Sequence, residues 1–397
     1  MQMNVETTEV EGLHAIPVGD LGIAAMRGCE ELAGKVNTYL NRVRSQAMEQ
    51  GAIPNTAEFA DYVKDDYCID VACPRFGSGE GKGIIKQSVR GTDLFILCDT
   101  FNYGVTYRMY GKEVVMSPDD HYQDIKRVIC AAAGKARRIN VIMPMLYEGR
   151  QHRRTARESL DCAVALQELV AMGVDNIITF DAHDSRVHNA IPMAGFENVQ
   201  PAYQMIKAMV NNVPNLHFDR DHMMVISPDE GGMSRCIFYS TVLGVPLGMF
   251  YKRRDYTRIV NGRNPIVKHE FLGESVEGKD LIIVDDMISS GDSVLDIANQ
   301  LKAKNAGRIF VCTSFGLFTE GLASFDEAYE KGLIEKVFTT NLIYRTEELR
   351  ARPWYCEVDM SKYIAYLINN LNHDLSLSEL LDPSKKIHKF LGDRGLA

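Results

Sequence analysis

The most constraining feature of the sequence is the run LIIVDDMISSGDS at residues 281–293. Its apolar stretch is too short for a helix, and the apolar residues downstream recur with helical period, so the run predicts a buried strand, a loop and a helix. Ser293 falls at the expected N-cap of that helix. A helix start leaves backbone N–H groups unpaired and carries a partial positive charge, which favours a bound anion.

The side chains of this loop suit a phosphorylated ribose. The adjacent carboxylates of Asp285 and Asp286 follow the strand, where they would face sugar hydroxyls. Small and hydroxyl residues come next, and their amides and hydroxyls would surround the phosphate. For this motif taken alone, the alternative is an ordinary strand-to-helix turn with solvated carboxylates.

The composition limits the class of protein. A chain of 397 residues indicates two domains, and a net charge of -9 argues against a general affinity for nucleic acid or an anionic membrane. The nine cysteines include no Cys-x-x-Cys pair, which argues against structural zinc and a disulfide framework. The N-terminus lacks the layout of a signal peptide and no apolar run reaches membrane-spanning length, so we expect a cytoplasmic protein.

Short β-branched runs alternate with helical patterns along the chain. These runs lie at residues 140–143, 176–180, 223–226, 281–284 and 308–312. Such alternation predicts parallel sheets covered by helices, with binding groups at the carboxyl ends of the strands.

A trace of duplication supports two similar halves. The stretch 88–97 resembles 275–284, and both read as a turn followed by a strand. We therefore expect an α/β fold with tandem domains at residues 1–200 and 201–397. The expected boundaries include the option that the extreme C-terminus packs with the first domain.

Several segments stand outside this regular alternation. We expect an excursion at 50–66, a long loop or small hairpin at 100–121, and a mobile lid that carries cations at 255–274. Residues 360–371 read as an amphipathic helix, and residues 382–397 are basic and peripheral.

A second loop, SPDEGG at residues 227–232, follows another predicted strand. Gly231 and Gly232 would let the backbone approach an anion closely, and Arg235 would hold a phosphate oxygen. A simple helix-initiating turn is the alternative.

Two further motifs concentrate charge at strand ends. The strand at 176–180 ends in FDAHD, where His183 would bind a metal or a phosphate unless it is a structural histidine. The cationic run RQHRR at 150–154 would suit a triphosphate, with a solvated loop as the alternative. The glycines at 77–83 match neither the P-loop nor the dinucleotide spacing.

From about Arg75 to Leu381, the order of these motifs resembles that of the ribose-phosphate pyrophosphokinases. The resemblance implies two tandem phosphoribosyltransferase-like domains, each a mainly parallel sheet covered by helices. It implies transfer of the β,γ-diphosphoryl group of ATP to the C1 hydroxyl of ribose 5-phosphate, giving phosphoribosyl pyrophosphate and AMP. It also implies Mg²⁺ as cofactor and a homo-oligomer, a dimer or hexamer, with active sites near subunit interfaces.

The resemblance carries roles onto the matching positions of this chain. The residues implied to bind ATP are Phe76, Ser78, Glu80, Arg150 and Gln151. The residues implied to lie near magnesium are His183 and Asp229. The catalytic cations are Lys252, Arg254 and Arg235. The residues implied to bind the pyrophosphate and the ribose 5-phosphate are Gly231, Gly232, Asp285, Asp286, Ser289, Ser290, Gly291, Asp292 and Ser293.

The chain departs from the family pattern at several of these places. The sugar-phosphate loop usually reads Asp-Thr-Gly-Gly-Thr, whereas here Asp292 stands near the expected phosphate and would repel it unless its side chain turns outward. His152 replaces a usual Asp, and Ala182 replaces a usual Leu. The stretches 50–66, 100–121 and 255–274 are longer than usual, so we expect oligomeric contacts and allosteric sites to differ.

Two other functions remain open on the sequence. A phosphoribosyltransferase that consumes phosphoribosyl pyrophosphate would use the loop at 285–293 equally well, but it has no role for the segments at 76–80 and 150–151. A catalytically silent relative that regulates an active partner is the other alternative. Retention of Lys252, Arg254 and His183 argues against it.

Overall fold

The computed structural model describes residues 16–54, 56, 59, 61–254 and 266–396, with the backbone alone for residues 252–254 and 266–269. Its contacts divide the chain into two compact units. Unit 1 comprises Met1–Val199 and Met360–Leu381, and unit 2 comprises Gln200–Asp359 and Asp382–Ala397. The segment that rejoins unit 1 is therefore Met360–Leu381, while the extreme C-terminus groups with unit 2.

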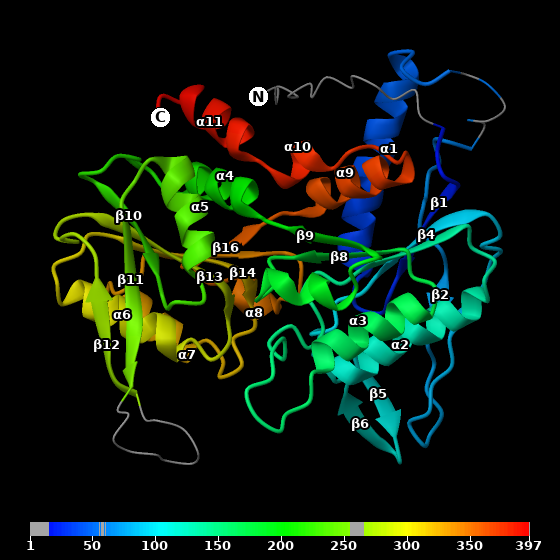
Figure 1. Cartoon of the computed structure of the whole chain (residues 1–397), viewed down its shortest axis with the longest axis horizontal. Helices are drawn as coiled ribbons and strands as arrows, with labels where there is room; N and C mark the ends of the chain where they lie inside the picture. Colours follow the sequence, from blue (N-terminus) through cyan, green and yellow to red (C-terminus); the bar gives the residue numbers. More distant parts are fainter. Residues whose placement is uncertain (1–15, 55, 57–58, 60, 255–265, 397) are drawn as a thin grey trace. The chain divides into compact units, whose positions relative to one another are not determined.

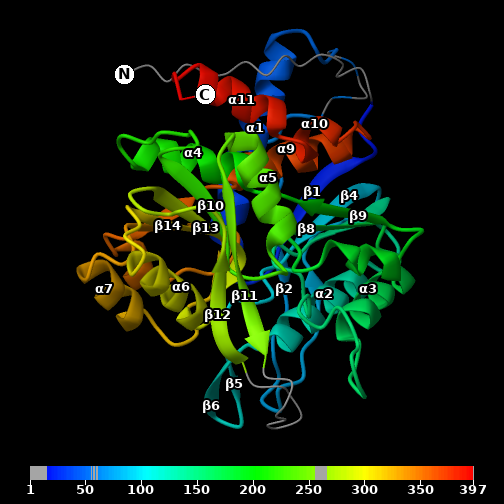
Figure 2. The ribbon, with the colours of Figure 1, turned by 60° about the vertical axis from the view of Figure 1, so that its left-hand side comes forward.

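Unit 1 is built on a fully parallel, five-stranded sheet in the order β1-β4-β7-β8-β9. Its strands are β1 (Asp20–Ala25), β4 (Thr92–Leu97), β7 (Arg138–Ile142), β8 (Asn176–Phe180) and β9 (Gly195–Val199). Every residue of β4 is buried, so the sheet needs helices on both faces. Helices α2 and α3 cover one face, and α1 and α9 cover the other (Figures 1 and 2).

The long helices of unit 1 present apolar stripes to this sheet. They are α1 (Glu30–Glu49), α2 (Pro118–Ala132), α3 (Asp161–Ala171) and α9 (Ser361–Asn372). The unit also contains the short helix α10 (Ser378–Leu381), which buries no residue, and a 3₁₀ helix, η2, at Ser185–Ala190. In α1 the residues Leu32, Val36 and Leu40 recur every four positions and are buried, as an amphipathic helix requires. The Ser117 hydroxyl accepts a hydrogen bond from the backbone N–H of Asp120, and the Asp120 carboxylate accepts one from the backbone N–H of Ser117. This capping box fixes where α2 begins.

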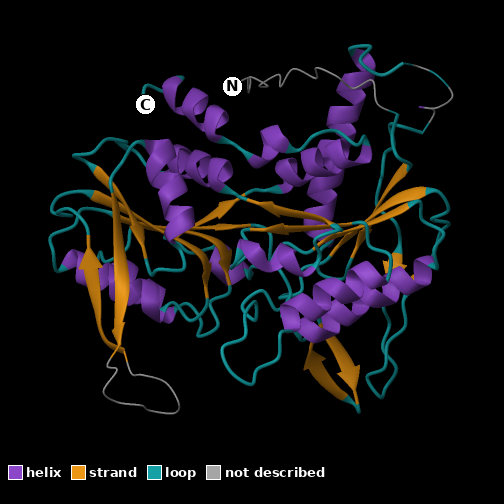
Figure 3. Cartoon of the chain, in the orientation of Figure 1, coloured by secondary structure: helices purple, strands orange, loops and turns teal. Residues whose placement is uncertain are grey.

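Two small hairpins accompany the sheet of unit 1. Strand β2 (Val71–Ala72) pairs with β3 (Ile84–Ile85), and β5 (Thr106–Met109) pairs with β6 (Lys112–Val115). Figure 3 shows β5 and β6 as a hairpin standing away from the main sheet. The expected long loop or hairpin at 100–121 is thus the β5–β6 hairpin followed by the start of α2.

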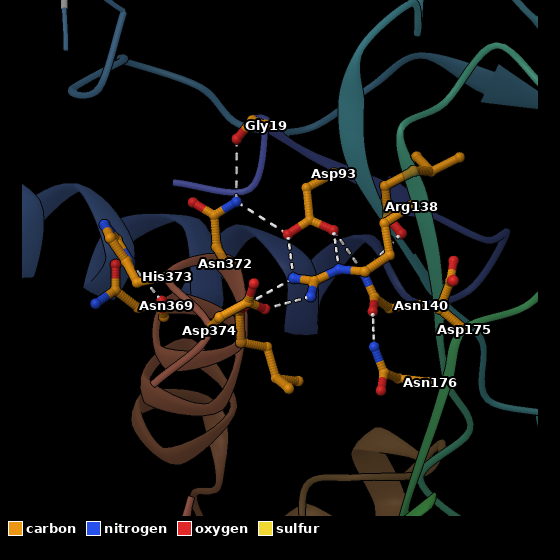
Figure 4. Close-up of polar contacts among 12 residues, drawn as sticks. Gly19, Asp93, Arg138, Asn140, Asp175, Asn176, Asn369, Asn372, His373 and Asp374 are labelled. Atoms are coloured by element: carbon orange, nitrogen blue, oxygen red, sulfur yellow. Dashed lines mark hydrogen bonds and ion pairs between the residues drawn. The ribbon is translucent and has the colours of Figure 1, made fainter. Parts of the chain in front are cut away.

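A polar network around a buried carboxylate joins the C-terminal end of α9 to the amino ends of the interior strands β4 and β7 (Figure 4). The carboxylate of Asp93 on β4 accepts hydrogen bonds from Arg138, Asn140 and Asn372. Arg138 also pairs with Asp374 at 2.7 Å. Because Asp93 is completely buried, these partners replace the water that its charge would otherwise require.

Unit 2 is built on a seven-stranded sheet in the order β12-β11-β10-β13-β14-β15-β16. Its strands are β10 (Met223–Ser227), β11 (Leu247–Arg254), β12 (Ile266–Leu272), β13 (Asp280–Ile288), β14 (Ile309–Gly316), β15 (Lys336–Thr340) and β16 (Tyr355–Val358). All neighbours are parallel except β12, which pairs antiparallel with β11.

Helices cover both faces of this second sheet as well. They are α4 (Ala202–Asn212), α5 (Met233–Leu243), α6 (Asp292–Lys302), α7 (Ala323–Glu330), α8 (Glu347–Arg350) and α11 (Ser384–Gly392). Helices α4 and α5 lie on one face, and α6 and α7 on the other (Figures 1 and 2). Apolar residues of α6 and α7 pack on β13 and β14 around the fully buried Trp354. The expected α/β fold with mainly parallel sheets is confirmed.

The structure corrects three local expectations. Strand β13 continues through the two aspartates to Ile288, and α6 is capped by Gly291 rather than by Ser293. The stretch predicted as a lid contains β12, while residues 255–265 lie outside the described residues.

No helix among residues 16–254 and 266–396 that the structure describes is long and apolar enough to cross a membrane.

Candidate functional site

The strand order of unit 2 reverses at one point. From β10 the chain passes to β11 on one side, whereas from β13 it passes to β14 on the other. In open α/β sheets, ligands bind outside the carboxyl ends of the two strands that flank such a reversal. β10 and β13 are direct neighbours, with Ile226 aligned to Ile283, so their following loops meet at this edge.

Strand β13 carries a pair of adjacent carboxylates near its carboxyl end. Asp286 is buried and its backbone N–H donates to Asp285 Oδ1 at 2.9 Å. Burial, together with the neighbouring carboxylate, raises the pKa of Asp285 well above its usual range. A bound cation or a pair of sugar hydroxyls would relieve this repulsion, because each interacts favourably with ionised carboxylates.

The next residues form the predicted phosphate loop. Gly291 has φ +97°, and a Cβ at this position would lie 2.3 Å from the Phe325 ring. Only glycine therefore fits this turn into α6 without displacing a fully buried aromatic side chain. The Ser290 hydroxyl donates a hydrogen bond to the Asp292 carboxylate at 3.0 Å. The Asp292 side chain is therefore held by a residue of the phosphate loop and is not turned away from that loop.

The glycine loop after β10 leads directly into α5. The carboxylate of Asp229 accepts from the backbone N–H groups of Gly231 and Gly232, at 2.9 and 3.3 Å. Arg235, in the first turn of α5, lies with Nη1 3.8 Å from Asp285 Oδ1. The fold thus brings Arg235 of α5 beside the Asp285 carboxylate of β13.

Cys236 helps to hold these two loops together. Its thiol donates towards Val284 O at 3.3 Å and Ile226 O at 3.8 Å, which belong to the two strands that flank the reversal. The residue is fully buried. It therefore anchors α5, and with it Arg235, over the carboxyl ends of β10 and β13.

Two of the three predicted catalytic cations lie on the neighbouring strand. Lys252 and Arg254 belong to β11, beyond the part of β11 that pairs with β10, in the hairpin with β12. The pairing register shifts between Arg253 and Arg254. The side chains of both cations lie outside the described residues.

In unit 1 the loops after β7 and β8 also meet. His152 Nε2 lies 3.4 Å from Asp184 Oδ2, and the His152 ring centroid is 5.3 Å from that of His183. Hydrogen bonds from Arg186 hold the pKa of Asp184 well below its usual range, while burial lowers the pKa of His152. At neutral pH this corner therefore carries an ionised carboxylate and an uncharged imidazole.

The cationic loop lies beside this corner. Arg150 is exposed, and Gln151 donates to Ser159 O at 2.9 Å. His152, the next residue in the chain, is the member of this loop whose ring lies beside His183. The sequence analysis placed His152 in the cationic run at 150–154 and noted it as a departure from the family pattern, but it did not single out Asp184, which ends the motif FDAHD.

Residues 76–80, which include three of the residues implied to bind ATP and would contact its adenine, form a segment that we call the predicted adenine segment. Phe76 N donates to Glu80 O at 2.7 Å and Ser78 Oγ donates to Glu80 Oε2 at 2.8 Å, which closes a tight turn. Arg75, immediately before it, makes a bidentate ion pair with the buried Asp124 on α2, at 2.8 and 2.9 Å. Sequence reasoning missed Asp124, because a single carboxylate in an amphipathic helix gives no signal of its partner.

Each unit thus has the form of a phosphoribosyltransferase domain, with loops gathered at the carboxyl ends of parallel strands. Residues 21–173 match the family model of the N-terminal domain of ribose phosphate pyrophosphokinase, and residues 196–342 match that of the phosphoribosyl transferase domain. The chain belongs to the ribose-phosphate pyrophosphokinase family.

Named relatives agree with this assignment. A ribose-phosphate pyrophosphokinase from Vibrio parahaemolyticus is 25% identical over 333 residues, which cover 82% of this chain and 96% of the relative. One from Prochlorococcus marinus is 28% identical over 280 residues, covering 69% of this chain and 75% of the relative. The crystal structure of phosphoribosylpyrophosphate synthetase from Mycobacterium smegmatis matches with a TM-score of 0.67 and 21% identity, over 89% of this chain and 99% of that one. This structural likeness supports the fold.

Proposed function

We propose that the chain is a ribose-phosphate diphosphokinase, which transfers the β,γ-diphosphoryl group of ATP to the C1 hydroxyl of ribose 5-phosphate. The products are phosphoribosyl pyrophosphate and AMP. The observation that carries this proposal is the meeting of the two ligand loops at the strand-order reversal of unit 2, with Arg235 beside Asp285. The match of residues 21–173 to the N-terminal domain of ribose phosphate pyrophosphokinase supports a donor nucleotide rather than a nucleobase as second substrate.

The sugar phosphate would occupy the loop after β13. Asp285 and Asp286 orient the ribose hydroxyls, and the hydroxyls of Ser289, Ser290 and Ser293 bind the 5-phosphate with the amides at the start of α6. Gly291 allows the backbone to approach that phosphate closely. The pyrophosphate would lie over Gly231 and Gly232, where the backbone N–H groups are held in place by Asp229.

The donor nucleotide would use residues of unit 1. Phe76, Ser78 and Glu80 contact the base, and Arg150 with Gln151 binds the phosphates. In-line attack at the β-phosphorus spreads negative charge over its non-bridging oxygens, so Lys252, Arg254 and Arg235 stabilise the transition state. Losing one well-placed cation of this kind should lower the rate by about 100-fold or more.

Magnesium fits this donor set as a substrate-bound ion. Among the described residues, no group of three or more His, Cys, Asp or Glu side chains is arranged to hold a metal by itself. Mg²⁺ usually takes one or two protein carboxylates and completes its shell with water and substrate phosphates, and Asp229 offers such an oxygen. His183 would contact the hydrated ion or the phosphates it binds. When bound, the ion would neutralise charge on the triphosphate.

The proposal includes assembly as a homo-oligomer, a dimer or hexamer with active sites near subunit interfaces. The test of the reaction mixes the purified chain with Mg²⁺, ATP and ribose 5-phosphate and follows the products by phosphorus NMR. We expect sugar-dependent AMP and a C1-linked diphosphate, both lost in Lys252→Ala. Well-folded protein that gives neither product would contradict the proposal and favour a silent regulatory relative, and turnover that needs a nucleobase and phosphoribosyl pyrophosphate instead would indicate a transferase.

A further inference from the structure

The β5–β6 hairpin packs against the predicted adenine segment. Tyr110 N at the hairpin tip donates to Gly77 O at 2.8 Å, and Gly77 directly follows Phe76. Gly79 lies so close to Met109 that a Cβ there would be 2.6 Å from the Met109 sulfur. The inserted stretch and the segment at 76–80 therefore form one composite surface.

Charged residues at the base of both segments strengthen this contact. The Arg75 guanidinium that pairs with Asp124 also lies 5.3 Å from the centroid of the Tyr107 ring on β5. A second arginine, Arg127, pairs with the same carboxylate at 2.7 Å. Because Asp124 is buried and held by two cations, the segment and the hairpin share a rigid foundation.

The residue at the tip of the hairpin is an unusual choice for its backbone conformation. Tyr110 and Gly111 form a two-residue loop between β5 and β6, with φ +48° and +76°. Two-residue loops with positive φ at both positions strongly prefer Asn-Gly, since bulky side chains are strained there. Such strain is found where a side chain serves a function.

The side chain of Tyr110 is available for binding. It is 80% exposed, and among the residues that the structure describes it makes no ring contact or side-chain hydrogen bond. Phe76 on the adjoining segment is 56% exposed. Two large aromatic residues are therefore presented to solvent on segments joined by a backbone hydrogen bond.

We propose that Tyr110 and Phe76 together form a stacking platform for the purine base of the donor nucleotide, so that the inserted hairpin sets the affinity for that base. The inference rests on the proposed function, in which the segment at 76–80 contacts the base. Aromatic stacking suits any planar base, and the nearby carboxylate and hydroxyl of Glu80 and Ser78 would distinguish purines by their exocyclic groups.

The first test replaces Tyr110 with Asn, the residue that this turn prefers. Tyr110→Asn should leave the melting temperature unchanged or raise it, because it relieves backbone strain. It should raise KM for ATP about tenfold, as expected for a lost stacking contact. KM for ribose 5-phosphate and inhibition by inorganic tripolyphosphate, which has no base, should stay the same, and Tyr110→Phe should restore KM for ATP.

The second test measures binding directly. The single tryptophan, Trp354, is fully buried, so Tyr110→Trp adds an exposed reporter at the hairpin tip. We expect ATP, but not ribose 5-phosphate or tripolyphosphate, to change its fluorescence. Met193→Trp, at a 97% exposed position elsewhere in unit 1, is the matched control and should not respond.

The outcomes separate this inference from the proposed function. If the wild type makes phosphoribosyl pyrophosphate but Tyr110→Asn has an unchanged KM for ATP, the proposed role of Tyr110 in stacking on the base is wrong, while the proposed function holds. If no nucleotide binds the wild type, the proposed function is wrong, and the stacking platform, which rests on it, is wrong as well. A reporter signal that depends on protein concentration and not on ATP would overturn the platform and assign the hairpin tip to a contact with a second copy of the chain.

Discussion

Arg138 donates two hydrogen bonds to the fully buried carboxylate of Asp93, from Nε at 2.9 Å and Nη2 at 2.8 Å. In unit 2, Arg308 approaches Asp280 in the same way, with Nη2 at 2.6 Å. Each aspartate lies near the start of a central strand, and each arginine lies at or just before the start of the next strand of the sheet. The faint sequence repeat at 88–97 and 275–284 is therefore a structural repeat as well.

The Asp93 pair should contribute more to stability than the Asp280 pair. Asp93→Asn would replace one carboxylate oxygen by an NH₂ group, which would then face the donor of either Asn140 or Asn372, and it would leave the Arg138 charge poorly paired. We expect it to lower the free energy of unfolding by about 3 kcal/mol. Asp280→Asn, whose side chain is partly exposed, should cost about 1 kcal/mol. Urea denaturation of both variants would measure the difference, and equal losses would show that burial does not set the cost.

Asp292 should weaken the binding of the sugar phosphate. Its carboxylate holds the Ser290 hydroxyl and adds a negative charge at the start of α6. Asp292→Asn should lower KM for ribose 5-phosphate about threefold to fivefold, the range expected for an exposed charge. Asp296→Asn, one helical turn further along α6, removes the same charge away from the loop and is the control. A KM that rises in Asp292→Asn would mean that the carboxylate assists binding.

Gly291 should tolerate no side chain. Gly291→Ala combines a left-handed backbone position with a clash against the buried Phe325 ring, so we expect a loss of about 3 kcal/mol of stability. Gly278→Ala has a similar φ of +73° but meets nothing within 4 Å, and should cost only about 1 kcal/mol. Thermal melts of the two variants separate the clash from the backbone strain. Similar melting temperatures would show that Phe325 moves aside easily.

His373 should make unit 1 less stable in mild acid. Burial lowers its pKa to about 4, against about 6.5 in the unfolded chain, and its Nδ1 lies 2.6 Å from Asn369 O. The unfolded state therefore binds a proton that the folded state does not, and stability falls as the pH drops from about 6.5 to 4, by about 3 kcal/mol in all.

The test compares the pH profile of His373→Asn with that of the wild type. The variant should show a shallower loss of stability between pH 6.5 and 4. His388→Asn, at an exposed position on α11, controls for the change of charge in the unfolded chain. Parallel profiles for the wild type and His373→Asn would contradict the expected role of burial.

Much of the fold followed from local patterns. The β-branched runs at 140–143, 176–180, 223–226, 281–284 and 308–312 all lie in or largely within strands β7, β8, β10, β13 and β14. The amphipathic pattern at 360–371 corresponds to α9. Periodicity of this kind is a property of neighbouring residues, so the sequence is sufficient to show it.

The partners of the site residues could not be predicted in the same way. Asp124 pairs with Arg75 across 49 positions, and His152 lies beside Asp184 across 32. Nothing in the local pattern of either residue indicates its partner, because these contacts arise only when strands and helices pack. The N-cap of α6 was also misplaced, since α6 begins after a left-handed turn at Gly291, a position that the packing of Phe325 restricts to glycine.

The sequence by itself determined the class of fold, the order of the ligand loops and the residue types that they carry, because strand, turn and helix signals are local. Only the tertiary structure decided which residues meet. The strand-order reversal brings Arg235 to Asp285, the hairpin insertion packs Tyr110 beside the adenine segment, and the network of Asp93 ties α9 to a sheet more than 270 positions away. These juxtapositions depend on packing and on the pairing of buried charges, which long-range contacts alone establish.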